Sequence, residues 1–280
     1  MSLQKSFSNK ATLFLVATPI GNLQEMTPRA IDTLKGVAVV AAEDTRNTRK
    51  LLSHFDIKTK LIAHHKFNEV ESTAGLIKYL QDGKDVALVS DAGYPLISDP
   101  GEILVKEVIA AGFSVVSISG SSAMLNALVA SGITTLPFYF HGFLPSNNSA
   151  NKKVLKELKT YPMTLIFYES VHRIARTLEN MLAIFGDRNI CVARELTKLY
   201  EEFYRGSISD LLTNMLELKG EFVVIVEGCS DLKADISLAD LEMIIREYQT
   251  SGLSVNAAIK KVALEYNVSK NALYRQVHKS

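Results

Sequence analysis

The chain has 280 residues, of which 47% are hydrophobic and 22% charged, with a formal net charge of +1. This composition is typical of a globular protein with one large or two medium domains. No run approaches the ~18 apolar residues that span a membrane, and Met1–Lys10 lacks the apolar stretch of a secretory signal. Two cysteines, Cys191 and Cys229, argue against a disulfide framework and a Cys-rich zinc site. We expect a cytoplasmic protein. Its net charge is too small to attract nucleic acid as a whole, so any basic surface must be confined to part of the molecule.

Short apolar runs alternate with helical segments in the first half of the chain. Buried strands are expected at Leu13–Ala17, Val37–Ala42, Leu61–Ala63, Val86–Ser90 and Val115–Ile118. Thr27-Pro28 is typical of a helix start, and Asn68 followed by Glu71 indicates a capping box. Asp99-Pro100 opens a further helix that Gly112 ends. The alternation predicts a mostly parallel sheet covered on both faces, with ligands outside the carboxyl ends of its strands.

A change of composition at Pro145–Lys153 predicts a domain boundary. We therefore expect an N-terminal α/β domain at residues 11–144 and a second α/β domain at residues 145–230. In the second domain, strands are expected at Met163–Tyr168, Asn189–Ala193 and Phe222–Val226, an extended segment at Tyr200–Ser207, and a helix from about Val171.

Residues 237–280 predict three short helices with tight turns, an arrangement typical of a helix-turn-helix bundle. The helices are expected at Ser237–Thr250, Asn256–Tyr266 and Lys270–His278. From Ser254 onward the basic residues are Lys260, Lys261, Lys270, Arg275 and Lys279, against Glu265 as the acid. This local excess of positive charge is a candidate RNA-binding surface.

Three loops rich in small residues follow predicted strands. They are Thr18–Asn22, Ser90–Gly101 and Ser119–Ala123. In the first loop, glycine permits close approach of a ligand to the backbone. The second loop is long for a βα connection, which is typical of a binding loop. In the third loop, exposed amides at a helix start are suited to bind an anion. Taken alone, the first loop is better explained as an ordinary strand–helix connection. A serine N-cap is the alternative for the third loop and needs no ligand. None of the three is a P-loop or a Gly-x-Gly-x-x-Gly turn, so ATP and NAD are not indicated.

A fourth stretch, Glu43-Asp44-Thr45-Arg46, also follows a predicted strand. Two acids and an arginine there are able to orient a hydroxyl group or hold a phosphate. Acids in the first turn of a helix are also expected simply because they complement the helix dipole. The residue pattern leaves both interpretations open.

Six motifs in order resemble one family. They are Val16-Ala17-Thr18-Pro19-Ile20-Gly21-Asn22-Leu23, Ala42-Glu43-Asp44-Thr45-Arg46, Val89-Ser90-Asp91-Ala92-Gly93 with Pro95–Gly101, Gly142-Phe143-Leu144-Pro145, Phe167-Tyr168-Glu169-Ser170 with His172-Arg173, and Ala193–Lys198. The family is ribosomal RNA small subunit methyltransferase I, a branch of the tetrapyrrole methylase superfamily. The resemblance runs from about Leu13 to Gly228, and the C-terminal helices resemble the family's appendage more loosely.

The resemblance implies two α/β domains of the tetrapyrrole-methylase (class III methyltransferase) type with a small C-terminal three-helix appendage. It implies a homodimer that binds S-adenosylmethionine between its domains and methylates the 2′-hydroxyl of a cytidine ribose in the decoding region of 16S ribosomal RNA. The substrate would be that RNA or the small ribosomal subunit. By position, the cofactor residues would be Pro19, Ile20, Gly21, Gly93, Tyr94, Ile97, Ser121, Ser122, Ala123, Tyr168 and Glu169.

Four positions, Ser119, Ser121, Tyr94 and Val171, depart from the family pattern. Ser119-Gly120-Ser121-Ser122-Ala123 stands where the family has Pro-Gly-Pro-Ser-Ala, and the loop is less preorganised because proline fixes φ. Tyr94 replaces a usual threonine, and Val171 replaces a usual proline.

A ribose hydroxyl is a poor nucleophile, so a nearby base should help the transfer. Asp44 is the first candidate for this base and Glu43 the second. Arg46 is the third catalytic candidate and would hold a flanking phosphate. The residues expected to contact RNA are Arg49, Arg173, Arg194, Lys198, Lys260, Lys261, Lys270 and Arg275. Surface or inter-domain ion pairs explain the arginines equally well. The histidines show no metal-ligand spacing with cysteine or carboxylate, so no metal is expected.

Two alternatives remain at this stage. A tetrapyrrole (precorrin-type) methyltransferase has the same fold and attracts its carboxylate-rich substrate with arginines, but it needs neither the Glu43–Arg46 motif nor a basic appendage. A non-catalytic nucleic-acid-binding regulator built on the last three helices would leave the loops of the main body unexplained.

Overall fold

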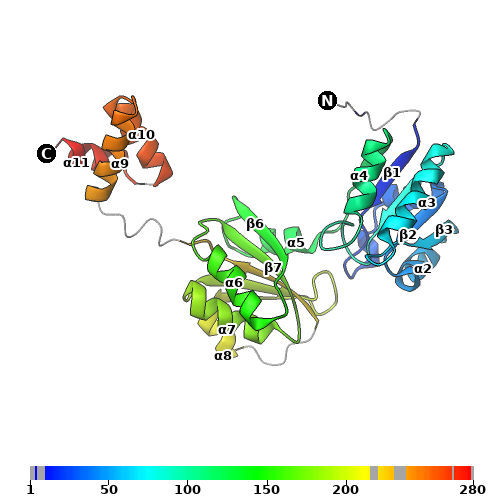
Figure 1. Ribbon diagram of the computed structural model, residues 1–280. Helices are drawn as coiled ribbons and strands as arrows, with labels where there is room; N and C mark the ends of the chain where they lie inside the picture. The colour runs from blue at the N-terminus through cyan, green and yellow to red at the C-terminus, as the bar shows by residue number, and fades with distance from the viewer. Residues whose placement is uncertain (1–3, 5–9, 215–219, 230–237, 267, 279–280) are drawn as a thin grey trace.

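The computed structural model describes residues 4, 10–214, 220–229, 238–266 and 268–278. The chain forms two units, each built on a five-stranded sheet, and a group of helices at the C-terminus (Figure 1). The expected architecture of two α/β units and a three-helix appendage is confirmed. Four residues of the predicted appendage lie outside the described residues, namely Ser237, Asn267, Lys279 and Ser280.

The first sheet is entirely parallel, as the alternating pattern predicts. Its strands are β1 (Thr12–Val16), β2 (Val39–Ala42), β3 (Lys60–Ala63), β4 (Val86–Val89) and β5 (Ser114–Ile118), in the order β3-β2-β4-β1-β5. Every residue of the neighbouring strands β2 and β4 is buried, which explains their continuous apolar sequences. All five carboxyl ends lie at one edge, where the four candidate stretches begin.

Helices cover both faces of the first sheet. They are α1 (Pro28–Gly36), α2 (Thr45–His54), α3 (Glu69–Gln81) and α4 (Glu102–Ala110), with a short 3₁₀ helix, η1 (Leu23–Glu25), before α1. Leu34 of α1 and Leu52 of α2 share one buried cluster, and Leu80 of α3 and Leu104 of α4 share another. The sheet is therefore closed on both faces, and its carboxyl edge is where ligands gain access.

Of the two predicted helix caps before α1 and α3, one is observed. Thr27 Oγ1 accepts a hydrogen bond from the Ala30 amide at 3.1 Å, as the Thr-Pro signal predicts. Asn68 makes no side-chain cap, because its Oδ1 accepts the amide of His65 at 2.8 Å. The capping box predicted with Glu71 is therefore wrong.

Helix α4 begins later than Asp99-Pro100, at the residue after Gly101. Its first amides are satisfied from another helix, since Glu69 Oε1 accepts the amides of Gly101 at 3.0 Å and Ile103 at 3.2 Å. This contact between α3 and α4 leaves Asp99 in the preceding loop, at the carboxyl edge of the sheet.

The second sheet is mixed. Its strands are β6 (Phe138–Phe143), β7 (Thr164–Ser170), β10 (Glu221–Val226), β8 (Asn189–Arg194) and β9 (Glu202–Ser207), in the order β6-β7-β10-β8-β9. Only the β6–β7 pair is parallel; the others are antiparallel. Helices α6 (Asn148–Leu158), α7 (Ile174–Phe185) and α8 (Ile208–Asn214) pack on one face, and α5 (Ala123–Ala130) packs on the other.

The chain passes from the first sheet to the second before the predicted boundary between residues 144 and 145. Strand β6 pairs with β7, and Ala127 and Leu128 of α5 pack against Ile166 and Val223 of the second sheet. The polar stretch after Pro145 begins helix α6, whose cap is formed by Asn147. The change of composition therefore marks a helix start inside the second unit.

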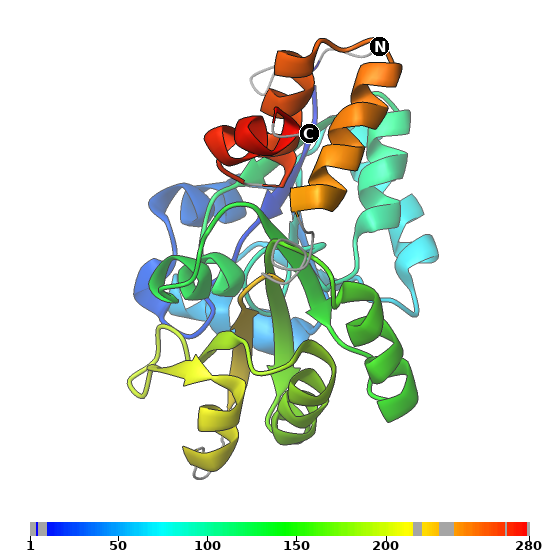
Figure 2. The ribbon, with the colours of Figure 1, turned by 90° about the vertical axis from the view of Figure 1, so that its left-hand side faces the viewer.

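The last three helices, α9 (Leu238–Thr250), α10 (Val255–Glu265) and α11 (Lys270–Val277), share a core of their own. Leu241, Ile259 and Leu273, one from each helix, are buried in it. Glu242 on α9 accepts hydrogen bonds from Arg246 and Gln276, which links α9 to α11. Figure 2 shows the three helices gathered into one bundle. Within the described part of the chain, no helix is both long and apolar enough to cross a membrane.

Candidate active site

The first two candidate loops are joined at the carboxyl edge of the first sheet. The amide of Thr18 donates to the Gly93 carbonyl at 2.9 Å, and the amide of Gly93 donates back to the Thr18 carbonyl at 3.0 Å. Thr18 Oγ1 also donates to the Ser90 carbonyl at 3.1 Å. Gly93 has a φ of 76°, which glycine adopts without steric cost. These bonds hold two loops that are about 70 residues apart in a fixed arrangement.

The third loop is tied to the second loop and to the 3₁₀ helix η1 that follows the first loop. The Gly120 amide donates to the hydroxyl of Tyr94 at 3.2 Å, and Ser121 Oγ donates to Glu25 Oε2 at 2.6 Å. A Cβ atom at Gly120 would meet the Cβ of Ala17 at 2.9 Å, so only glycine fits. Tyr94, which departs from the family pattern, thus anchors the loop that lacks the family's prolines.

A cavity of about 510 Å³ opens between the two α/β units beside these loops. Most of the predicted cofactor residues line it, namely Ile20, Gly93, Tyr94, Ile97, Ser122, Ala123, Tyr168 and Glu169. The second sheet and the loop after β8 add an apolar wall that includes Leu196, Phe222 and Val223. This wall was not predictable from the sequence, because buried strand residues carry no signal of the ligand they face.

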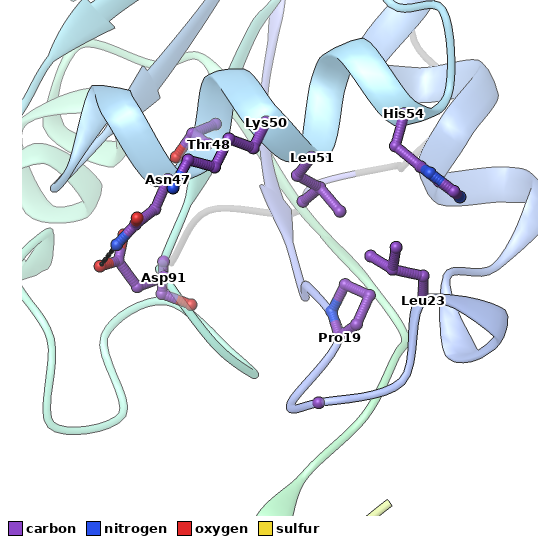
Figure 3. Close-up of a pocket in the computed structure, with 10 residues that line it drawn as sticks. Pro19, Leu23, Asn47, Thr48, Lys50, Leu51, His54 and Asp91 are labelled. Atoms are coloured by element: carbon purple, nitrogen blue, oxygen red, sulfur yellow. Dashed lines mark hydrogen bonds between the residues drawn. The ribbon is translucent and has the colours of Figure 1, made fainter. Parts of the chain in front are cut away.

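The three other predicted cofactor residues lie elsewhere. Pro19 and Gly21 line a second cavity, of about 350 Å³, between the loop after β1 and helix α2 (Figure 3). Ser121 lines neither of these two cavities, and its hydroxyl is bound to Glu25.

The carboxylate of Glu169 is held by the start of α7. Its Oε1 pairs with the guanidinium of Arg173 at 2.8 Å and accepts the Ser170 amide at 2.8 Å, and its Oε2 accepts the hydroxyl of Thr177 at 2.7 Å. Arg173 also donates to the Leu144 carbonyl at 3.1 Å. Glu169 thus borders the larger cavity, but its carboxylate is already bound to Arg173, Ser170 and Thr177. Arg173, which was predicted to contact RNA, links β7 to the loop after β6.

The other basic residues predicted in the second unit also form ion pairs. Arg194 Nε lies 2.7 Å from Glu202 Oε2 across the β8–β9 pair, and Lys198 Nζ lies 2.9 Å from Glu195 Oε1. Lys198 lines the larger cavity and packs so closely on Gly21 that a Cβ there would lie 2.6 Å from Lys198 Cγ. Arg194 therefore has a structural partner, whereas Lys198 connects the second unit to the first candidate loop.

The loop that carries Lys198 has an unusual backbone. Glu195 and Thr197 adopt φ angles of 49° and 67°, in the left-handed region. Thr197 Oγ1 is buried without a hydrogen-bond partner. Strained residues of this kind persist where the surroundings fix them, often beside a ligand. Glu195 lines the cavity, and sequence analysis did not select it as a site residue.

Asp44 occupies the N-cap of α2. Its Oδ1 accepts the Arg46 amide at 2.8 Å, and its Oδ2 pairs with the Arg46 guanidinium at 3.0 Å. The hydrogen bond from the Arg46 side chain, followed by the one from its backbone, lowers the pKa of Asp44 to about 2. Neither residue lines the two cavities described. Such a low pKa makes Asp44 a poor general base, and the motif fits the helix-start interpretation.

Asp99, which sequence analysis treated as part of a helix start, lines the larger cavity. Burial is the largest cause that raises the pKa of Asp99 to about 7, followed by the charges of Glu43 and Asp91 and a hydrogen bond to Glu43. A carboxyl group with a pKa near neutrality is suited to general base catalysis. Glu43, the second predicted base, therefore contacts the group best placed for that role.

The predicted RNA-binding residues outside the second unit lie on helix surfaces. Arg49 is exposed on α2, and Lys260, Lys270 and Arg275 are exposed on α10 and α11. The ammonium group of Lys261 lies 4.1 Å from the centroid of the Tyr248 ring. The described residues contain no group of three or more His, Cys, Asp or Glu side chains arranged to hold a metal ion.

Solved structures with this fold include a diphthine synthase and the methyltransferase CobJ. The first has a TM-score of 0.59 and 12% identity over 78% of this chain and 90% of the other. The second has a TM-score of 0.58 and 19% identity over 79% of this chain and 95% of the other. At these identities the likeness establishes the fold alone.

Comparison of sequences gives a more specific result. Residues 12–212 match the family described as Tetrapyrrole (Corrin/Porphyrin) Methylases. Proteins named ribosomal RNA small subunit methyltransferase I are 49% identical in Streptococcus pyogenes serotype M3, over 99% of each chain, and 46% identical in Bacillus subtilis, over 98% of each. The protein of that name from Haemophilus influenzae is 46% identical over 94% of this chain and 95% of its own. The chain therefore belongs to the tetrapyrrole methylase family, in the branch of ribosomal RNA small subunit methyltransferase I.

Proposed function

We propose that this protein transfers the methyl group of S-adenosylmethionine to ribosomal RNA of the small subunit. The observation that carries the proposal is the identity of 49% with a relative of that name over 99% of both chains, appendage included. The resemblance of the six motifs refines it to the 2′-hydroxyl of a cytidine ribose in the decoding region of 16S ribosomal RNA.

The larger cavity has the properties that S-adenosylmethionine requires. Its volume of about 510 Å³ lies within the usual range for small-molecule sites. Ile20, Ile97 and Leu196 offer apolar surface for an adenine ring. Helix α5 begins at this wall without a side-chain cap from Ser122. The Met124 amide is hydrogen-bonded to Tyr168, and the other amides of the first turn are available to a carboxylate. The carboxylate of Asp91 offers a partner for the positive charges of the cofactor.

We assign the general base to Asp99 in place of Asp44. When bound, S-adenosylmethionine supplies a methyl group that is already activated, so much of the catalysis is positioning. The Asp99 carboxylate would accept the proton of the ribose hydroxyl as the oxygen takes the methyl group, whose bond to the sulfonium sulfur breaks to leave a neutral thioether. The carboxyl group would later release the proton to water. Burial, followed by the charges of Glu43 and Asp91, keeps the pKa of Asp99 near the working pH.

The remaining contacts belong to the same proposal. The appendage, through Lys260, Lys261, Lys270 and Arg275, and the loop of Lys198 would contact RNA phosphates outside the cavity. A homodimer in the cytoplasm is the assembly and location that the family resemblance implies.

The test is transfer of labelled methyl from S-adenosylmethionine to small ribosomal subunits from a strain that lacks the gene. Mass-spectrometric mapping should find a single 2′-O-methylcytidine in the decoding region. A methylated base, or a modified nucleotide elsewhere, would contradict the assignment of the acceptor. Transfer to a tetrapyrrole, with none to RNA, would establish the alternative substrate class.

A further inference from the structure

The smaller cavity is a groove in the first unit, separate from the proposed cofactor site. It lies between α2 and the loop after β1 and has a volume of about 350 Å³. Figure 3 shows Leu51 of α2 pointing toward Pro19 and Leu23, with His54 at one end of the groove and Asp91 at the other. The groove therefore combines an apolar floor with polar ends.

The helix that forms one side of this groove presents positive charge. The sequence of α2 contains Arg46, Arg49, Lys50 and His54, and it contains no acid. Arg46 is paired with Asp44 at the N-cap, and Lys50 and His54 line the groove. Leu52 faces the core of the unit, and Thr48, which is also buried, lines the groove. Packing does not require cations on the opposite side of the helix, in a chain whose formal net charge is +1. This concentration of charge matches an anionic ligand.

The groove adjoins the larger cavity through a shared residue. Asp91 lines both of them, and the side-chain amide of Asn47 donates to Asp91 Oδ2 at 3.1 Å. A ligand that occupies the groove therefore extends to the wall of the cavity in which we place the methyl donor. This continuity favours a neighbouring part of the same acceptor molecule over an unrelated anion.

We propose that the groove binds a nucleotide of the RNA strand next to the methylated one. The base packs against Pro19, Leu23 and Leu51, and Lys50 and His54, which lie toward opposite ends of the groove, contact the phosphates on its two sides. Single-stranded RNA is recognised in this way, with bases turned onto apolar side chains and the backbone held by cations. The inference rests on the proposed function, because it assumes that RNA is the acceptor.

The first test changes the charge of the groove. Lys50→Glu should raise the KM for small ribosomal subunits by about tenfold or more, the effect of losing one good contact. The Kd for S-adenosylmethionine and the circular dichroism spectrum should stay unchanged, since Lys50 is exposed and lies outside the larger cavity. Lys50→Ala should have a smaller effect on KM and reduce the salt dependence of binding by about one phosphate contact.

Lys35→Glu is the matched control, with the same change of charge on an exposed residue near the end of α1, away from the groove. Its KM should equal that of the wild type. Equal KM values for Lys50→Glu and Lys35→Glu would overturn the groove assignment while the proposed function stood. Absence of any transfer by the wild-type protein would instead overturn the proposed function.

A second test locates the RNA directly. p-Benzoylphenylalanine in place of Lys50 should photo-crosslink to small-subunit RNA within a few nucleotides of the methylated cytidine, and the same group in place of Lys35 should not. A crosslink from position 50 to a ribosomal protein or to a distant RNA segment would overturn the proposal. Leu23→Ala should raise KM without changing the salt dependence, because it removes only apolar contact. An unchanged KM for this variant would exclude the base from the groove.

Discussion

The two α/β units differ in the relative direction of their strands. Because of this difference, the first unit supplies polar groups to the cavity and the second supplies mostly an apolar wall. In the first unit all strands are parallel, so five consecutive loops meet at one edge and bring together polar groups such as Glu43, Asp91 and Asp99. In the second unit most neighbours are antiparallel, and its contribution to the cavity is largely an apolar wall with charges that are already paired. We therefore expect substitutions in the first unit to affect turnover and those in the second to affect stability.

The largest expected effect is on turnover, at Asp99. Asp99→Asn should lower kcat by about 10²-fold or more, the usual contribution of a general base. Single-turnover transfer to small subunits measures this, together with the Kd for S-adenosylmethionine, which should change little. Asp82→Asn, at an exposed site after α3, is the control with the same chemical change. Turnover by Asp99→Asn within twofold of the control would exclude Asp99 as the base.

The same substitution should also change how stability depends on pH. Native Asp99 has a pKa of about 7, against an ordinary value of 3.8 for an aspartate, so the native state holds this proton over a pH range in which the unfolded state has lost it. The contribution of this site to stability therefore falls as pH rises from about 4 to about 7. Asp99→Asn should raise the Tm more at pH 8 than at pH 4. An equal shift at both values would show that Asp99 is not buried in this way.

In the second unit, the largest effect should come from the pair between Glu169 and Arg173. The Glu169 side chain is 1% exposed and that of Arg173 21%. Arg173→Met should lower the free energy of unfolding by about 3 kcal/mol, because it leaves a buried carboxylate without its partner. Urea denaturation measures this. Adding Glu169→Gln to the same chain should recover part of the loss. If Arg173→Met instead raised the KM for RNA without loss of stability, the RNA contact predicted for Arg173 from the sequence would be correct.

A smaller effect should appear in the pH dependence of the Glu43 variant. Asp99 accepts a proton only when ionised, so the wild-type rate should rise with pH up to about 7. Glu43→Gln removes a negative charge beside Asp99, which favours the ionised form and lowers its pKa. The midpoint of the pH–rate profile should move to lower pH. A midpoint that stayed in place would mean that another group controls the profile.

The elements of the first unit were more predictable from the sequence than those of the second. Strands buried on both faces, such as Val86–Val89, appear as continuous apolar runs, and the small residues after them indicate loops at one edge. Strand β6 is only half buried for most of its length and includes His141 and Gly142, so no such run marks it. The sequence around Asn147 indicated a break, although the side chain begins a helix there.

Within the candidate site, the loops were predictable and the charges were not. The length and the small residues of the Ser90–Gly101 segment indicate a binding loop. The pKa of Asp99 depends on Glu43, a residue 56 positions earlier, and only the folded sheet brings the two together. Similarly, the sequence alone suggests that Arg173 binds a phosphate. In the fold, the guanidinium of Arg173 instead contacts Glu169 and the Leu144 carbonyl.

The smallest effect should come from Asp44, and it separates a helix cap from a catalytic base. Asp44→Ala removes the acceptor for the Arg46 amide, so the Tm should fall. Asp44→Ser should restore it, because a serine hydroxyl also caps a helix but has no carboxylate. Both variants should keep kcat within about threefold of the wild type, since the loss of a true base costs about 10²-fold or more. If both variants lost turnover to that extent while they bound S-adenosylmethionine normally, Asp44 would be the base, and the raised pKa of Asp99 would reflect only burial among acids. Retained turnover with a restored Tm in Asp44→Ser would leave Asp44 as the cap that fixes α2 and its groove beside the methyl donor.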